Sequence, residues 1–226
     1  MTVAVFTLIV LVGTAIAIWW LLQPTNLGVT YAAADREAFY QKLGIVFEAL
    51  PKSESKTLVL SGTHRVDQTF TSAELSAAAD NRSRQYAYFP FRNVQIRVNT
   101  DGTVEGSGTV RYTDAVRYLV ALGVSSSDIE EAAKKFNIPA VDIPVYLKAS
   151  GDITQNTSNI TIHEAKIARI SVPANLVQEY APAINPLIDM IIKSRPPTSI
   201  EKLEVTNGAV RVVGTAPNIE RAVQRL

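Results

Sequence analysis

The most hydrophobic stretch of the chain is an apolar run at its start, from Val3 to Leu22. About twenty residues, at ~1.5 Å rise per residue in a helix, span the ~30 Å hydrocarbon core of a bilayer. The adjacent Trp19 and Trp20 suit the interface between membrane and water, where an indole ring has an apolar and a polar side. The sequence therefore predicts a transmembrane anchor within residues 1–24.

The apolar run differs from a cleaved secretory signal, which has a basic start and a short apolar segment. No Lys or Arg precedes the run, and the small-residue pattern from Ala32 to Ala34 lies well beyond its end. We therefore expect an uncleaved anchor in the cell membrane. By the positive-inside rule, Arg36 and Lys42 would favour a cytoplasmic domain. However, this rule is a weak predictor of the orientation of long domains. We expect the domain to be extracytoplasmic.

After Asp35, the first charged residue, hydrophobic positions alternate with the periods of amphipathic helices and half-buried strands. This pattern predicts one α+β domain over residues 35–226, joined to the anchor by a short linker at 25–34. Helices are expected at 35–50, 72–84, 114–122, 127–136 and 176–193. Strands are expected at 57–68, 93–99, 103–112, 143–149, 160–162, 167–172, 200–206 and 209–215.

Two hairpins are indicated by turn residues between alternating strands, Asp101 with Gly102 and Asn207 with Gly208. In the first hairpin, Gly106 and Gly108 share a face with the apolar residues of their strand. Glycines on such a face leave room for another group to approach the sheet closely, or they mark a bend.

The segment 176–193 is hydrophobic over more than one stripe, which is typical of a helix enclosed by other structure. Pro182 and Pro186 lie within it and promote a kink. The predicted fold is therefore α+β, with a curved antiparallel sheet wrapped around one long apolar helix.

Composition and motifs narrow the chemistry of the domain. The 22 basic and 21 acidic residues give a formal net charge of +1, which lacks the excess of positive charge expected for nucleic-acid binding. The absence of cysteine excludes disulfides and thiolate metal sites. His64 and His163 are far apart, and no nucleophile elbow or phosphate-binding loop is present. We expect no catalytic residues and no metal or other cofactor.

A family resemblance is carried by five features that follow the N-terminal apolar run in this order: Phe70–Leu75, the hairpin that turns at Asp101 and Gly102, residues 143–151, residues 170–173 before the long helix, and the closing hairpin at 203–212. In pattern and order they resemble the YpmS-like proteins of bacteria, whose plan is similar to that of the tubular lipid-binding (TULIP) superfamily. The resemblance implies a bacterial envelope protein in which the sheet and the long helix enclose an apolar groove for acyl chains.

The groove would be lined by the apolar faces of the strands at 93–99 and 143–149 and of the long helix. The expected lining residues are Val94, Ile96, Val98, Ile143, Val145, Leu147, Leu176, Tyr180, Ile184, Leu187, Ile188 and Ile191. The same side chains could instead pack together as an ordinary core, because a core and a lipid groove have similar compositions. The expected partner is membrane lipid. The alternative is a non-catalytic structural or assembly subunit that contacts other membrane proteins.

Overall fold

The computed structural model describes residues 21–50, 57–135 and 140–224. The helices of these ranges are α2 (Ala33–Leu43), α3 (Ser72–Gln85), α4 (Tyr112–Ala121), α5 (Ser126–Lys135), α6 (Ala174–Tyr180) and α7 (Ile184–Lys193), with the 3-10 helix η1 (Ala181–Ala183) between the last two. The strands are β1 (Val46–Ala49), β2 (Leu58–Ser61), β3 (His64–Thr71), β4 (Phe91–Val98), β5 (Thr103–Val110), β6 (Ile143–Thr154), β7 (Thr157–Ile167), β8 (Ile170–Ser171), β9 (Ser199–Thr206), β10 (Ala209–Ala216) and β11 (Ile219–Ala222).

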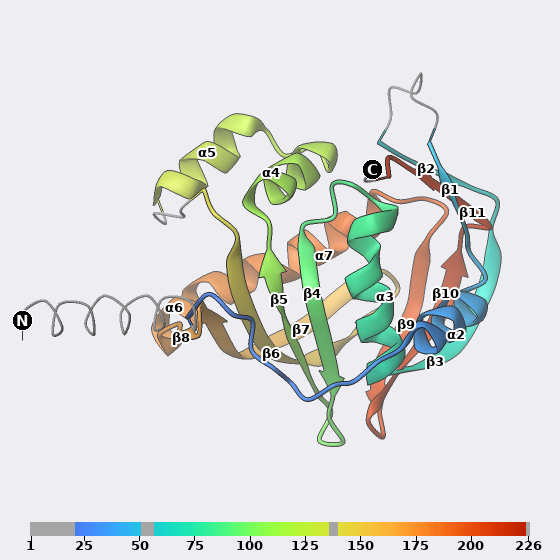
Figure 1. Cartoon of the computed structure of the whole chain (residues 1–226), viewed down its shortest axis with the longest axis horizontal. Coiled ribbons are helices and arrows are strands. Elements are labelled where there is room, and N and C mark those ends of the chain that lie inside the picture. Colours follow the sequence, from blue (N-terminus) through green and yellow to red (C-terminus); the bar gives the residue numbers. More distant parts are fainter. Residues whose placement is uncertain (1–20, 51–56, 136–139, 225–226) are drawn as a thin grey trace, which may run out of the picture.

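Among the described residues, eight strands form one antiparallel sheet and three short strands form a second (Figure 1). The large sheet bends at β6, the longest of its strands. Residues 143–150 of β6 pair with β5, whereas residues 153 and 154 pair with β9. The opposite edge of β6 pairs with β7. Since two strands share one edge of β6, the sheet turns at this strand and encloses a concave face.

The free edge of β4 is covered by α3. Three polar side chains of the helix, each one turn apart, accept hydrogen bonds from backbone N–H groups of the strand. The pairs are Ser72 with Val98, Ser76 with Ile96 and Asp80 with Val94, at 2.9, 2.8 and 3.1 Å. Residues four apart in a helix are separated by ~6 Å along its axis, and residues two apart in a strand by ~6.6 Å. The spacing of the acceptors on α3 therefore matches the spacing of the N–H groups on β4. The helix thus takes the place of a further strand.

The edge of β7 is covered in the same way by α7. The Asn185 amide both accepts from the Ile160 N–H (2.9 Å) and donates to the Ile160 carbonyl oxygen (3.2 Å). One turn later, Asp189 accepts from the N–H (2.8 Å) and the hydroxyl (2.7 Å) of Ser158. As a result, α3 and α7 form two walls beside the concave face.

Residues 23–32 cross the opposite face of the sheet as a strap without helix or strand, drawn in blue in Figure 1. At one end, Arg169 donates hydrogen bonds to the carbonyl oxygens of residues 23 and 24, at 3.0 and 3.1 Å. Farther along, the Leu27 N–H donates to Gln95 and the Leu27 carbonyl accepts from Arg97. The Leu27 side chain is only 5% exposed. The segment expected as a linker at 25–34 is therefore attached to the domain at Leu27, and its last two residues begin α2.

A polar cluster lies beside the strap. The buried carboxylate of Glu105 accepts hydrogen bonds from Arg97 (2.7 Å), Asn99 (2.9 Å) and Tyr146 (3.1 Å). Burial alone would raise the pKa of Glu105, but these hydrogen bonds outweigh it and hold the pKa below its ordinary value. The negative charge of Glu105 is therefore part of the folded structure.

The helix at 72–84 and both hairpins are confirmed, including the capping box in which the Thr71 and Glu74 side chains each accept from the other's backbone N–H. The helix expected over 35–50 is too long: it ends at Gly44, whose φ of +71° forms a left-handed cap, and β1 follows. The strand expected over 57–68 is divided at Gly62, where φ is +69°.

The continuous helix expected over 176–193 is wrong, and no long apolar helix is evident. The segment consists of α6, η1 and α7. Pro182 lies in η1, where its missing N–H and its ring prevent the α-helix from continuing. Pro186 lies in the first turn of α7, where an N–H would have no intrahelical partner. The observed class is mixed α+β with a mostly antiparallel sheet.

Across residues 21–50, 57–135 and 140–224, no helix has both the length and the hydrophobicity needed to cross a membrane. The predicted anchor, with Trp19 and Trp20, lies outside these ranges except for its last residues.

Candidate functional site

An apolar cavity of about 420 Å³ lies on the concave face of the large sheet, between α3 and α7. Each surrounding element contributes hydrophobic side chains to its lining. They include Leu75 of α3, Ile96 of β4, Val104 of β5, Leu147 of β6, Ile184 and Ile188 of α7, and Leu203 and Val205 of β9. This volume falls in the ~300–1,000 Å³ range of small-molecule sites. We call this cavity the groove.

The floor of the groove is open at Gly106. No heavy atom lies within 4 Å of the position that a Cβ atom would occupy at this residue. Leu147 is paired with Gly106 across the sheet, and it is 37% exposed although it faces the concave side. In a filled core a leucine at this position would be covered by its neighbours. The missing side chain at Gly106 thus leaves real space.

A second apolar cavity, of about 310 Å³, lies beneath α4 and α5 and includes Val110 and Ile143 in its lining. These two residues are a cross-strand pair of β5 and β6, and Gly108 with Val145 is the next pair on the same face. The pair after that is Gly106 with Leu147. Because paired residues two positions apart share a face, the two cavities lie at the ends of one apolar strip.

The structure places the expected lining residues in several environments. Four of them line the groove: Ile96, Leu147, Ile184 and Ile188. Ile143 lines the second cavity, and Val145 lies on the strip between the two.

The other six expected lining residues are not part of either cavity. Val94 and Val98 are buried where α3 packs along β4. Leu187 and Ile191 are partly buried on α7, and Leu176 and Tyr180 are exposed on α6, because the break at η1 separates α6 from α7.

Sequence reasoning missed Ile153, which follows the strand expected at 143–149. It also missed seven further apolar lining residues, namely Leu75, Val104, Ala149, Ile160, Leu203, Val205 and Val210. Their alternation within the predicted elements was visible, but the bend of the sheet at β6 decides which faces meet. The glycine at position 106 was the one local sign of open space.

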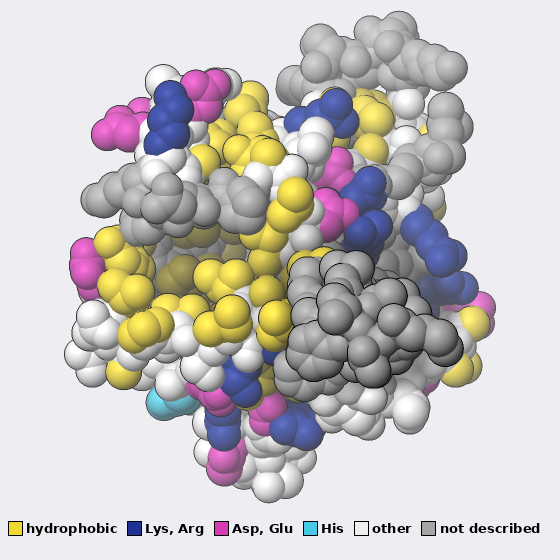
Figure 2. Space-filling view, turned by 60° about the vertical axis from the view of Figure 1, so that its left-hand side comes forward, with side chains coloured by type: hydrophobic (Ala, Val, Ile, Leu, Met, Phe, Trp, Pro, Cys, Tyr) yellow, Lys and Arg dark blue, Asp and Glu magenta, His cyan; other side chains and the backbone are white. Residues whose placement is uncertain are grey.

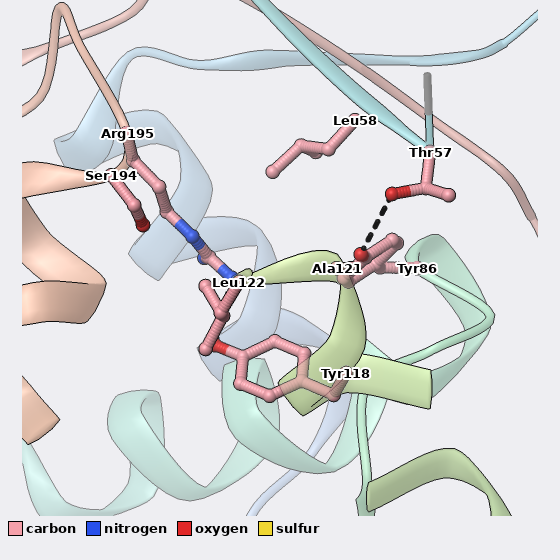
Figure 3. A pocket seen from close by; sticks show the side chains of 8 residues that line it. All are labelled: Thr57, Leu58, Tyr86, Tyr118, Ala121, Leu122, Ser194 and Arg195. Carbon is pink, nitrogen blue, oxygen red and sulfur yellow. Dashed lines mark hydrogen bonds between the residues drawn. The ribbon is translucent and has the colours of Figure 1, made fainter. Parts of the chain in front are cut away.

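A more polar pocket of about 390 Å³ lies between α4 and the chain that follows α7 (Figure 3). Its polar groups are already partnered: Arg195 donates to the Tyr118 hydroxyl at 2.7 Å, and the hydroxyls of Thr57 and Tyr86 are 3.2 Å apart. Burial raises the pKa of the Tyr86 phenol, so this group stays neutral at physiological pH. These contacts join the walls of the pocket, and we regard the groove as the stronger candidate site.

The histidines take part in local contacts. The ring nitrogens of His64 lie 2.8 Å from Asn218 Oδ1 and 2.9 Å from the Leu43 carbonyl oxygen. His163 Nε2 lies 2.7 Å from Ser150 Oγ, a distance suited to a nucleophile and its base. However, this pair is exposed. Although Ser150 is among the residues that line the groove, the other lining residues are mostly apolar. Among the described residues, no group of three or more His, Asp or Glu side chains could hold a metal ion.

Comparison with family models, with curated proteins and with solved structures finds no match to this chain.

Proposed function

We propose that this protein is a membrane-tethered domain of the bacterial cell envelope that binds lipid, or another long apolar ligand, in the groove. The observation that carries the proposal is the open apolar floor at Gly106 and Leu147, between the walls formed by α3 and α7. The apolar run at residues 3–22 supports the tether, and the family resemblance points to the same class of ligand.

The lining suits an acyl chain for a physical reason. Each methylene removed from water contributes about 0.8 kcal/mol, whereas an unpaired polar group buried beside it would cost about 2–7 kcal/mol. An acyl chain in a bilayer is already out of water, so a groove that receives it needs an equally apolar lining rather than strong specific contacts. The hydrophobic side chains of β4, β5, β6, β9 and α7 meet this requirement.

Photocrosslinking on the full chain tests the proposal. The protein is reconstituted into vesicles that contain a phospholipid with a photoreactive group near the end of one acyl chain. We expect crosslinks both in the predicted anchor and in peptides that contain Leu147 or Ile188. The Ile188→Asp variant should lose the crosslinks in the groove and keep those in the anchor, while Val120→Asp, a change at an exposed residue of α4, should keep both sets.

Crosslinks confined to residues 1–22 in the folded wild-type protein would contradict the proposal. Capture of membrane proteins by a groove that takes up no lipid would favour the alternative role as an assembly subunit.

A further inference from the structure

Exposed hydrophobic side chains gather at one end of the molecule, on β7, β8 and α6. Figure 2 looks toward this end and shows hydrophobic side chains around a hollow. Four residues form the cluster, which we call the apolar tip: Ile167 (52% exposed), Ile170 (63%), Leu176 (38%) and Tyr180 (37%). Hydrophobic side chains exposed together in this way indicate a surface that meets an apolar partner.

The turn at the centre of the apolar tip has an unusual backbone. Ile167 and Ile170 are paired, and the two residues between them, Ala168 and Arg169, have φ of +49° and +62°. Two-residue turns of this kind strongly favour Asn and Gly. Non-glycine residues in this conformation are sparsely populated and persist where surrounding contacts hold them. Here the contacts include the two hydrogen bonds from Arg169 to the strap, and one from the Ala168 N–H to the Pro144 carbonyl oxygen at 2.9 Å.

Those hydrogen bonds also hold the chain that directly follows the predicted anchor. Arg169 binds the carbonyl oxygens of residues 23 and 24, directly after Leu22, the last residue of the apolar run. Leu22 is itself 48% exposed, while Leu27 is buried on the sheet. The chain that follows the predicted anchor is therefore held beside the apolar tip from residue 23 onward.

The apolar tip is also continuous with the groove. Ile167 is paired with Val145, so both side chains lie on the face of the sheet that carries Leu147. A route from the tip to the groove floor thus passes along apolar side chains only two strand positions apart.

We propose that the apolar tip rests in the membrane interface beside the anchor, so that the mouth of the groove faces the bilayer. This proposal rests on the proposed function, because it assigns the lipid source of the same groove. An acyl chain could then pass from bilayer to groove without entering water. The partner is the lipid surface itself, since the apolar run ends at the tip and Arg169 holds the chain there.

Single-cysteine labelling of the full chain tests this orientation, because the protein has no cysteine of its own. Ile170→Cys carries an environment-sensitive fluorophore in vesicles of phosphatidylglycerol and phosphatidylethanolamine with spin-labelled lipid as quencher. Val46→Cys is the matched control: Val46 is also an exposed aliphatic residue (56%), and β1 lies at the opposite end of the molecule in Figure 1. We expect several-fold stronger quenching at position 170, at the depth of ~5–10 Å found for interfacial side chains.

A second variant tests the hydrogen bonds from Arg169 to the strap without changing the side chains of the apolar tip. Arg169→Asn keeps a residue that tolerates a positive φ but removes the reach to the strap. In the Ile170→Cys protein it should reduce quenching toward the value at position 46. Equal quenching at positions 170 and 46 in the protein with Arg169 would overturn the proposal.

The outcome can be distinguished from failure of the groove itself. Strong quenching at position 170 without groove crosslinks would leave the membrane contact standing and refute lipid binding. Groove crosslinks with no quenching at position 170 would support lipid binding in the groove and refute the membrane contact of the apolar tip.

Discussion

The open floor of the groove can be filled by a single substitution, Gly106→Leu. The position has no left-handed φ, and its Cβ would have no neighbour within 4 Å, so a side chain can be added without displacing the backbone. Glycine in a strand interior is unfavourable, and leucine there gains packing against Leu147 and Ile188. We therefore expect the variant to fold and to be at least as stable as the wild type.

The effect on binding follows from the space that the new side chain occupies. Leucine adds four carbon atoms to the floor and excludes about four methylenes of a bound chain. At about 0.8 kcal/mol per methylene, the loss is about 3 kcal/mol, or roughly 200-fold in the dissociation constant. Gly106→Ala adds one carbon atom and should cost about 0.8 kcal/mol, roughly fourfold.

The assay is a titration of the full chain, held in an amphipathic polymer, with a fluorescent fatty acid. Val46→Leu is the control for added hydrophobicity, because Val46 lies on β1, outside both cavities. A Gly106→Leu protein that unfolds like the wild type and binds the probe with unchanged affinity would refute the assignment of the groove. A graded loss from alanine to leucine would support it.

Three further predictions concern the framework of the groove. Gly44→Ala should destabilise the protein by more than the ~1–2 kcal/mol of a left-handed alanine, because the new Cβ would also lie 2.7 Å from the His64 ring; Gly102→Ala, with an equally positive φ but open space, is the control in thermal unfolding. Asn185→Ala should cost about 1–3 kcal/mol in denaturant unfolding, since it leaves the backbone of β7 unpaired, and an unchanged stability would show that α7 does not seal this edge. Because folding lowers the pKa of Glu105, this carboxylate contributes to the free energy of unfolding above about pH 4.3, and the contribution is lost as the pH falls through the folded pKa. Glu105→Gln should remove this part of the pH dependence of unfolding. Parallel stability profiles of the variant and the wild type against pH would contradict the reasoning.

Local signals predicted the local elements well. The capping box at Thr71 and the turns at Asp101 and Asn207 depend on contacts within a few residues, and each appears in the structure. The helix at 35–50 was overextended because β1 is specified by its pairing with the distant β11. Hydrophobic spacing at Val46 and Leu50 could not distinguish a helix from that strand.

The groove was harder to predict because it depends on contacts between elements distant in the sequence. The face that carries Val94, Ile96 and Val98 is uniform in sequence, yet only Ile96 reaches the groove. Among the polar residues of α3, Ser76 is fully buried against β4. A polar helix face that seals a strand edge has no distinctive composition.

Side chains of β5 point alternately to its two faces, so this one strand contributes both to the groove and to the polar cluster beside the strap. Gly106 opens the groove on one face, while its neighbour Glu105 faces the cluster beside the strap on the other. A shift of β5 by one residue would exchange these faces, placing a carboxylate in the apolar groove and removing the partner of Arg97. The ionic contact on the strap side therefore helps to specify the register that keeps the groove apolar. Because Arg97 also binds the Leu27 carbonyl, the same contact connects the groove floor to the segment that leads from the membrane.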